Sequence, residues 1–294
     1  MSWFRENKSQ VSYSLNKLYK AICISKQAVH KYAQEQNTYN CKLSELVILA
    51  DDIREAHPGC GVEKLYETLK PDFIGRDKFI DIFMSLGFRV KRNKNYIRTT
   101  YSIANQYPNL IKGLVVNQPS HIWQTDITYI RVGERFYYAV FIIDVYTKKI
   151  VGYHVSDNMR SACNIEAFRM ALKHHRAPLI HHSDRGGQYL CKRYLKLLKD
   201  NECQISMALS AQDNAYAERI NRTIKEEYLN YWKPKTFEEL KSQLKKAINN
   251  YNRRRIHNHL NKMIPLEFEK AWNQNSLEKI PEITIYNKEA IPLV

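Results

Sequence analysis

The chain has 294 residues, of which 44% are hydrophobic, so it can form a packed core in one large domain or in two to three smaller ones. This composition excludes a wholly disordered protein. The formal net charge of +16 and the pI of about 9.4 indicate affinity for a polyanion, most often a nucleic acid. A basic enzyme without a nucleic-acid partner is the alternative. An anionic membrane surface fits less well, because the charge is not gathered on one amphipathic helix.

The sequence also predicts a compartment. The first residues, Met1 to Lys8, contain no apolar run, so we expect no signal peptide. No stretch approaches the roughly 18 uninterrupted apolar residues of a membrane span. The six cysteines are scattered and form no CxxC pair, which indicates free thiols rather than a disulfide scaffold or a zinc cage. We therefore expect a protein of the cell interior.

The first part of the chain, residues 1–40, has the pattern of a helix-turn-helix module. Apolar residues recur at helical spacing from Val11 to Ile22, and Ser25 is suited to cap a second, short helix. That second helix would turn polar side chains outward toward DNA. These candidate DNA contacts are Lys26, Gln27, His30 and Lys31. A plain helical bundle without DNA contact is the alternative.

A second helical, DNA-binding module is expected over residues 41–88. Breaks at Pro58-Gly59, at Pro71 and at Gly87 separate its helices. The expected helices are Leu43–Ala56, Val62–Leu69 and Arg76–Leu86.

Residues 89–120 are expected to be a basic linker. No Asp or Glu occurs between Ile82 and Thr125, so this stretch is suited to follow a phosphate backbone. A merely solvated loop is the alternative. The candidate phosphate contacts in the linker are Arg89, Lys91 and Arg92.

The remaining sequence changes character, because β-branched strand patterns alternate with amphipathic helices. The expected strands are Trp123–Ile130, Phe136–Asp144, Lys149–Val155, Pro178–His182 and Gln204–Ala208. The expected helices are Ser161–His174, Tyr189–Asn201, Asp213 to about Tyr231, Thr236–Asn252 and Pro265–Trp272. This order is that of an α/β, ribonuclease H-like fold, a mixed five-stranded sheet flanked by helices. We assign residues 121–232 to this core and residues 233–294 to a C-terminal helical extension and tail.

Three carboxylates from separate elements of the core form the candidate catalytic and metal-binding site. In a ribonuclease H-like sheet the first and fourth strands are neighbours, so their ends bring Asp126 and Asp184 together. Asp126 lies within a strand, where an unpaired buried charge is costly unless it binds something. Glu218 lies in the helix that begins near Asn214. Such oxygen ligands suit two Mg²⁺ ions, which assist phosphoryl transfer by activating the attacking oxygen and stabilising the leaving one.

The helix that carries Glu218 has two distinct faces. Its apolar face, which should pack on the sheet, consists of Ala217, Ile220, Ile224 and Tyr228. Glu218, Arg222 and Lys225 form a neighbouring polar stripe. If Glu218 binds metal, Arg222 or Lys225 would contact the DNA backbone. An ordinary surface ladder of salt bridges is the alternative.

Several sequence blocks together resemble one protein family. The blocks around the carboxylates are Trp123-Gln-Thr-Asp126-Ile-Thr, His182-Ser-Asp184-Arg-Gly-Gly-Gln188-Tyr189 and Asp213-Asn214-Ala-x-x-Glu218, with Lys225 downstream. They resemble the catalytic blocks of insertion-sequence transposases of the DDE and retroviral-integrase superfamily. Two later blocks, residues 251–260 and 265–268, resemble the closing motif of the OrfB-type transposases that carry the integrase core. Residues 24–32 and 58–88 are similar to the helical modules of that family, so the resemblance spans nearly the whole chain.

The resemblance implies a transposase that cleaves DNA at the ends of an insertion sequence and joins the freed strand to a target. It implies Mg²⁺, or Mn²⁺ in its place, as the cofactor. The implied partners are double-stranded DNA with terminal inverted repeats, target DNA, further copies of the chain, and an upstream-frame DNA-binding protein. The implied location is the bacterial cytoplasm, with nucleoid association during the reaction. A ribonuclease H-like nuclease that cuts without joining, or an inactive DNA-binding derivative, is the alternative.

One departure from the family pattern bears on Glu218. The segment between Asp184 and Glu218 is shorter than usual, and the loop Ala208–Gln212 looks shortened. The assignment of Glu218 rests on the Asp-Asn-Ala block that precedes it and on Lys225, which follows it. Two further acids of this helix lack those flanking residues; they are Glu226 and Glu227.

Other polar residues near these blocks have weaker claims to a role. Asp144, at the end of a strand, is expected to be a structural carboxylate or to support the metal ligands indirectly. His181 and His182 are adjacent on a strand and point in opposite directions, so at most one of them faces the site. Gln188 is expected to position DNA or the Asp184 loop. The basic run of the closing motif is expected to bind phosphate, with a solvated run as the alternative; it consists of Arg253, Arg254 and Arg255.

Overall fold

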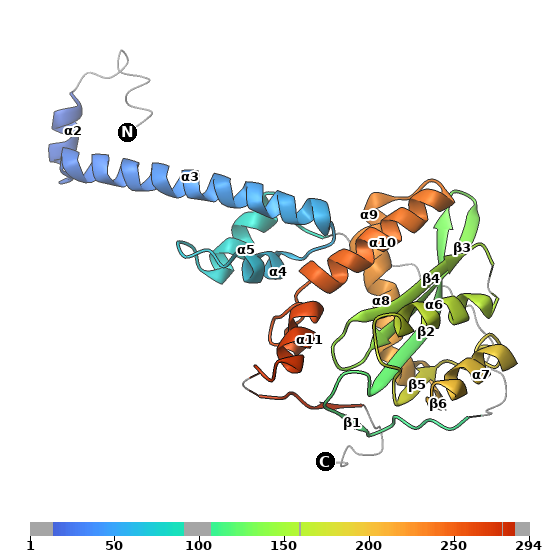
Figure 1. The fold of residues 1–294 in the computed structure, drawn as a ribbon. Helices are drawn as coiled ribbons and strands as arrows, with labels where there is room; N and C mark the ends of the chain where they lie inside the picture. Colours follow the sequence, from blue (N-terminus) through green and yellow to red (C-terminus); the bar gives the residue numbers. More distant parts are fainter. Residues whose placement is uncertain (1–13, 91–106, 159, 278, 286–294) are drawn as a thin grey trace.

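A computed structural model describes residues 14–90, 107–158, 160–277 and 279–285 of the chain. Figure 1 shows a globular α/β part from which a long helix projects, with a small group of helices packed beside that helix.

The N-terminal helical part contains four described helices. They are α2 (Leu15–Ala21), α3 (Lys26–Ala56), α4 (Val62–Leu69) and α5 (Arg76–Ser85). Apolar side chains of α4, α5 and the second half of α3 form a separate core, centred on Leu65, Phe79 and Phe83. The first half of α3 is almost entirely exposed, so packing in this core stabilises only one end of the long helix.

One prediction for this part is wrong. We expected a short helix after Ser25 and a separate helix from Leu43, whereas α3 continues without interruption from Lys26 to Ala56. No Gly or Pro occurs between Ser25 and His57, so nothing in the backbone requires a break. The expected module boundary after residue 40 falls inside this helix. The predicted cap is confirmed, because the Ser25 hydroxyl accepts a hydrogen bond from the Ala28 N–H at 3.0 Å.

The α/β part is built on a five-stranded sheet with the order β4-β3-β2-β5-β6. The strands are β2 (Ile122–Val132), β3 (Arg135–Asp144), β4 (Ile150–Ser156), β5 (Ile180–Ser183) and β6 (Gln204–Met207). The first three form an antiparallel meander, and β5 and β6 run parallel to β2. This is the mixed, ribonuclease H-like topology expected from the element order, with the first and fourth of these strands side by side.

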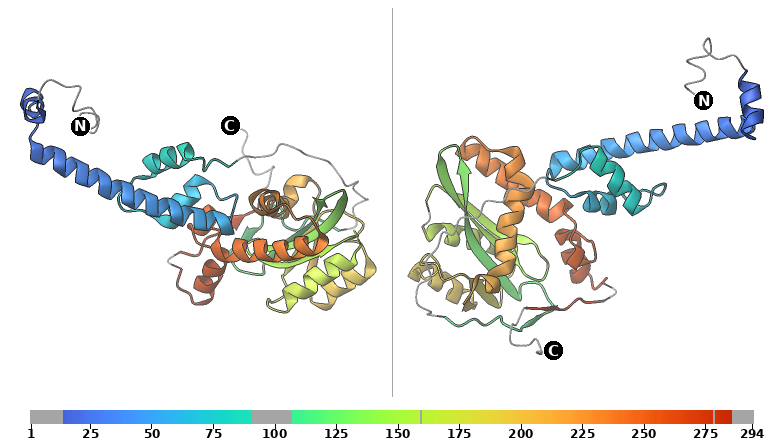
Figure 2. Two further views of the ribbon diagram at one scale, coloured as in Figure 1. Left: turned by 90° about the horizontal axis from the view of Figure 1, so that it is seen from above. Right: turned by 180° about the vertical axis from the view of Figure 1, so that it is seen from behind.

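Helices cover both faces of the sheet (Figures 1 and 2). Helices α6 (Ala162–Leu172) and α7 (Lys192–Asp200) share a core with one face, and α8 (Ala215–Ile224) and α10 (Phe237–Arg254) share a core with the other. The backbone of α6 approaches β4 closely at Gly152, where a Cβ atom would lie 2.3 Å from the Ala167 carbonyl oxygen.

Helix α8 continues into a π-helical turn, Lys225–Leu229, and then into the short helix α9 (Asn230–Trp232). The predicted apolar face of α8 is confirmed, because the side chains of this face are all buried in one core. They are Ala217, Ile220, Ile224 and Tyr228.

A third cluster of apolar residues closes the sheet at the end where β2 begins. It joins α11 (Pro265–Asn273) to the two-stranded sheet of β1 (Val115–Val116) and β7 (Ile283–Thr284). The predicted pair of C-terminal helices is present as α10 and α11. No helix in the described ranges combines the length and the apolar character needed to cross a lipid bilayer.

Candidate active site

The sheet brings the first two predicted carboxylates to neighbouring strands. Thr125 of β2 pairs with Ser183, the last residue of β5, in parallel register. The residues that follow them are Asp126, within β2, and Asp184, directly after β5. The Asp184 carboxylate accepts a hydrogen bond from the Gly186 N–H at 2.9 Å, which shapes the loop after β5. Two acids that are distant in sequence are thus adjacent because of strand order.

A buried glutamine next to Asp126 fixes the start of the helix that carries the third acid. The Gln124 side-chain oxygen accepts hydrogen bonds from the N–H groups of Tyr216 and Ala217 at 3.1 and 3.4 Å. Its amide nitrogen donates to the Asp213 carbonyl at 3.2 Å. The first N–H groups of a helix have no partner within the helix, so Gln124 serves as a cap supplied by the sheet.

A second amide side chain makes the reciprocal connection. Asn214 is buried and donates its side-chain N–H to the Thr125 carbonyl oxygen at 3.0 Å. The preceding turn is closed by Asp213, whose carboxylate accepts N–H bonds from Leu209 and Ser210 at 2.8 Å each. The Asp-Asn-Ala block therefore holds α8, and with it Glu218, against β2.

One residue of α8 and the first residue of the π turn interact with β2 itself. Asn221 donates a hydrogen bond to Asp126 Oδ2 at 2.8 Å, and the Lys225 ammonium donates to the Thr128 hydroxyl at 2.8 Å. The sequence pattern identified Lys225 only as a DNA contact, and it overlooked Asn221 and Gln124. A usable signal was present for Asn221, because it lies one helical turn from Glu218 and on the same side as Lys225.

The three acids are electrostatically coupled. Burial, followed by the nearby charges of Asp184 and Glu218, raises the pKa of Asp126 to about 8, although hydrogen bonds from Ile127 and Asn221 act against this rise. Burial raises the pKa of Asp184. Burial and the charge of Asp184 raise the pKa of Glu218. Each carboxylate is therefore easier to ionise if positive charge is placed among the three.

The donor set fits a hard divalent cation. All three side chains offer carboxylate oxygens, the ligands that Mg²⁺ prefers, and their mutual repulsion is what a bound cation would relieve. Over the described part of the chain, no group of three His, Cys, Asp or Glu side chains is drawn together tightly enough to form a metal cluster. The three acids nevertheless lie close enough for the charges of Asp184 and Glu218 to raise the pKa of Asp126.

Comparison with known proteins identifies the family of this chain. The sequence matches the family described as integrase core domain over residues 116–211 and again over residues 200–265. The transposase for insertion sequence element IS629 of Shigella sonnei is 30% identical over 227 residues, which cover 74% of this chain and 76% of that protein. The transposase for element IS904 of Lactococcus lactis subsp. lactis is 35% identical over 60% of this chain and 72% of that protein.

A 31 kDa protein of insertion element IS600 from Shigella sonnei is 32% identical over 68% of this chain and 77% of its own length. The chain belongs to the insertion-sequence transposases. Among solved structures, the HTLV-2 integrase catalytic core aligns with 55% of this chain and 99% of its own, with a TM-score of 0.44 and 20% identity.

The predicted DNA contacts of the transposase lie in several separate places. Lys26, Gln27, His30 and Lys31 are all exposed on the first turns of α3, at its end remote from the sheet (Figure 1). Arg89 is exposed just after α5, whereas Lys91 and Arg92 lie outside the described residues. Arg222 is exposed on α8 beside Glu218, and Gln188 is half-buried in the loop after Asp184.

The basic run of the closing motif is divided by the fold. Arg253 and Arg254 are exposed at the end of α10. Arg255 is buried, and its Nε and Nη2 atoms each donate to the Glu227 carboxylate at 2.7 Å. The expected phosphate contact of Arg255 does not fit this position, because a guanidinium already paired and shielded from water is not available to DNA.

The remaining polar residues of the transposase core have structural partners. Asp144 is fully enclosed and accepts N–H bonds from Tyr146 and Thr147 at 2.9 Å each, which agrees with a structural carboxylate. His182 bonds the Ser206 hydroxyl at 2.8 Å, and His181 bonds the Tyr194 hydroxyl at 2.6 Å on the opposite face. Neither imidazole contacts the three acids.

Proposed function

We propose that this transposase cleaves DNA at the ends of its insertion sequence and joins the freed strand to target DNA, with Asp126, Asp184 and Glu218 as metal ligands. The observation that carries the proposal is the convergence of these three acids from β2, the end of β5 and α8. In the reaction, water attacks a phosphodiester at the end of the element and releases a 3′ hydroxyl. That hydroxyl then attacks a phosphodiester of the target. A new P–O bond forms, and the 3′ oxygen of the neighbouring target nucleotide leaves.

The residues around the three acids have distinct proposed roles. Bound Mg²⁺, or Mn²⁺ in its place, would supply activation of the attacking oxygen and stabilisation of the leaving one. Asn221 orients the Asp126 carboxylate through its hydrogen bond, and the positive charge of Lys225 favours the ionised form of Asp126. Arg222 is exposed next to Glu218, where it would contact the phosphate backbone.

The proposed partners follow from the reaction and from the charge. The net charge of +16 supports binding of duplex DNA, namely the terminal inverted repeats and the target. We assign repeat recognition to the exposed polar residues at the start of α3, in the proposed module of residues 1–40. An element has two ends, so at least two copies of the chain would act together, with an upstream-frame protein as a further partner. The proposed location is the bacterial cytoplasm, at the nucleoid.

A cleavage and strand-transfer assay tests the proposal. Labelled DNA from the ends of the element would be incubated with Mg²⁺ or Mn²⁺ and either the wild type, Asp126→Asn or Glu218→Gln. We expect joined products from the wild type only, reduced at least a thousandfold in each variant, because each substitution removes a charged metal ligand while keeping the size of the side chain.

The matched control is Glu226→Gln, which removes an acid of the same helix outside the proposed site and should retain joining. Cleavage without joining by the wild type would favour a ribonuclease H-like nuclease. If Glu226→Gln is inactive while Glu218→Gln joins strands, the assignment of the third ligand is wrong.

A further inference from the structure

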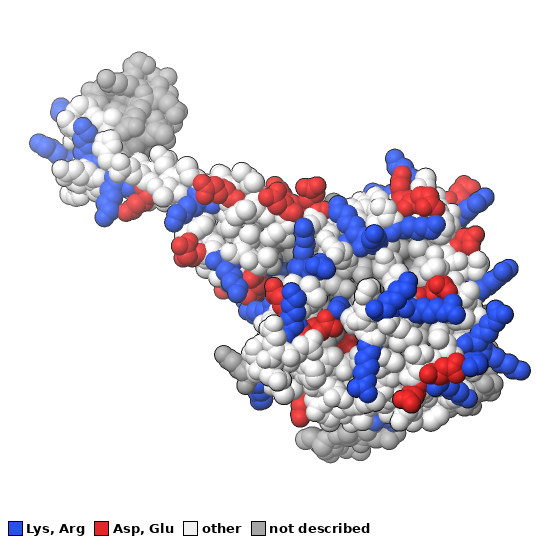
Figure 3. Space-filling model, in the orientation of Figure 1, with Lys and Arg blue, Asp and Glu red and all other residues white. Residues whose placement is uncertain are grey.

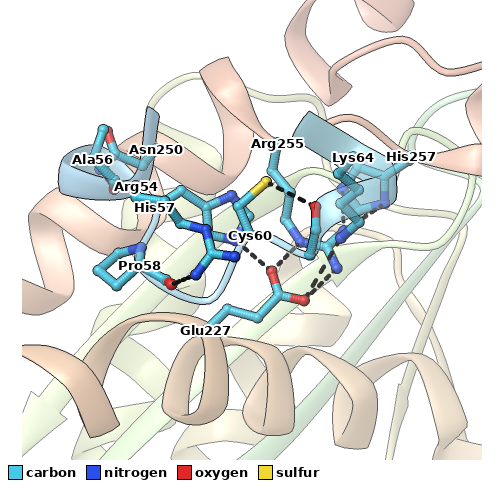
Figure 4. Close-up of polar contacts among 11 residues, drawn as sticks. Arg54, Ala56, His57, Pro58, Cys60, Lys64, Glu227, Asn250, Arg255 and His257 are labelled. Carbon is cyan, nitrogen blue, oxygen red and sulfur yellow. Dashed lines mark hydrogen bonds and ion pairs between the residues drawn. The ribbon is translucent and has the colours of Figure 1, made fainter. Parts of the chain in front are cut away.

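A buried cluster of charged side chains joins the helical part of the chain to the α/β part (Figure 4). Its centre is Glu227, in the π turn that follows α8. The turn between α3 and α4 contributes His57, α4 contributes Lys64, and the end of α10 contributes Arg255. The cluster thus connects a helical module with the two helices that cover the catalytic face of the sheet.

The Glu227 carboxylate is fully engaged by these partners. Arg255 donates from Nε to Oε2 and from Nη2 to Oε1, both at 2.7 Å. His57 Nε2 lies 2.6 Å from Oε2, and Lys64 Nζ lies 3.6 Å from Oε1. Burial alone would raise the pKa of Glu227, but the hydrogen bonds from Arg255 and His57 hold it far below its ordinary value. The His57 and Arg255 side chains are only 4% and 9% exposed, so water does not replace these contacts.

The backbones of the two parts also touch at this point. The Gly59 N–H donates to the Glu227 carbonyl oxygen at 2.8 Å. A Cβ atom on Gly59 would lie 2.4 Å from the Glu227 Cα, so only glycine permits this approach. The His57 ring stacks on Tyr228 with its centroid 4.7 Å away, and the Asn250 amide donates to the Ala56 carbonyl oxygen.

The π turn gives this contact a consequence for the catalytic helix. A π turn is less favourable than α-helix and persists where its surroundings hold it. Asn221, just before the turn, and Lys225, its first residue, contact β2, whereas Glu227 and Tyr228, within the turn, contact the helical module. If the turn relaxed to α-helix, the residues at its end would rotate by up to about 100° relative to α8. Both sets of contacts are satisfied together only while the turn is kept.

We propose that Glu227 is a positioning residue that couples the helical module to the active site. Clamped by Arg255, His57 and Lys64, it holds the π turn, and the turn sets the register in which Asn221 and Lys225 meet β2 beside Asp126. This inference rests on the proposed function, because it assigns Asp126 to the reacting centre. It also gives Arg255 of the closing motif a role within the protein instead of on DNA.

The sharpest test acts on the contact from the module side and changes no charged group. Gly59→Ala introduces a Cβ atom against the Glu227 backbone, whereas Gly61→Ala, two residues on, introduces one where nothing lies within 4 Å. Glu227→Asp perturbs the same contact from the other side, since a shorter acid cannot reach Arg255 and His57 together. Full-length proteins would be compared by amide hydrogen exchange over residues 217–229 without DNA or metal, and by repeat-DNA affinity and single-turnover cleavage rate.

We expect Gly59→Ala and Glu227→Asp to speed exchange over residues 217–229 at least tenfold and to slow cleavage at least tenfold. DNA affinity should stay within threefold, and Gly61→Ala should match the wild type. Lys64→Met, which removes only the most distant partner, is the milder variant if the others do not fold. Unchanged exchange over residues 217–224 in the variants, or equal effects of Gly59→Ala and Gly61→Ala, would overturn the proposal. An inactive wild type would instead count against the proposed function, and the exchange comparison would still decide the coupling.

Discussion

Asp126 is a single residue whose ionised form destabilises the metal-free fold. It lies within β2 beside two other acids, and burial together with their charges raises its pKa to about 8. A carboxyl whose pKa in the folded protein exceeds its unfolded value contributes stability at low pH, and this contribution is lost as the pH rises through the folded value. In the metal-free protein, ionised Asp126 is therefore a cost that a bound cation would offset.

Replacing Asp126 by Asn removes this ionisation. We expect metal-free Asp126→Asn to gain free energy of unfolding relative to the wild type as the pH rises from 5 to 8, by more than about 1.4 kcal/mol, the equivalent of one pKa unit. Urea denaturation in the presence of a chelator measures the difference in free energy of unfolding between variant and wild type at both pH values. Asp72→Asn, at an exposed position, is the control and should follow the wild type. If this difference is the same at pH 5 and pH 8, ionisation of Asp126 does not destabilise the fold.

Helix α8 shows how one element is positioned by its neighbours more than by its own sequence. Its first N–H groups are capped by Gln124 from β2, and the residue before it, Asn214, donates back to the β2 backbone. Helix α8, which carries Glu218, and strand β2, which carries Asp126, are therefore linked at residues close to Asp126. Loss of that link should affect both the stability of the fold and the placement of Glu218.

Gln124→Ala tests this link. The substitution leaves the buried N–H groups of Tyr216 and Ala217 without their acceptor, and we expect it to lower the free energy of unfolding by about 1–3 kcal/mol. Chemical denaturation at neutral pH measures the loss. Gln212→Ala removes an exposed glutamine just before the same helix and should change stability by less than about 0.5 kcal/mol. Similar losses in the two variants would show that the cap from β2 is unimportant.

At the scale of the whole molecule, positive charge is spread widely. Figure 3 shows Lys and Arg side chains over much of the visible face of the globular part, and not in one compact patch. Arg253 and Arg254 are exposed at the end of α10, close in sequence to the buried Arg255 that ties α10 to the π turn. Phosphate bound there would be held near the contact between the helical and the α/β parts.

The salt dependence of DNA affinity tests whether Arg253 and Arg254 contact phosphate. Each neutralised phosphate adds about 0.9 to the slope of log affinity against log salt concentration, so the double variant Arg253→Ala/Arg254→Ala should reduce the slope by about 2. The double variant Arg253→Lys/Arg254→Lys keeps both charges and should keep the slope. An unchanged slope in the alanine variant would mean that this part of the closing motif does not bind the backbone.

The sequence by itself determined the architecture of the α/β part, and it predicted three acids as the metal ligands. Strand alternation and helical periodicity reflect which side chains must be buried, so the order of elements and their apolar faces could be predicted locally. Asp126 was recognisable because a charged residue within a strand is costly without a function. The match of Asp126, Asp184 and Glu218 to the family blocks supplied what periodicity could not.

The tertiary structure alone decided which polar residues work in pairs. Gln124 and Glu227 find their partners on elements that are distant in sequence, so no local pattern indicates them. The same holds for Arg255, which looks like its exposed neighbours in sequence but is buried against Glu227 and His257. Burial and ion pairing are properties of the assembled fold, because the free energy of a charged group depends on what surrounds it in space.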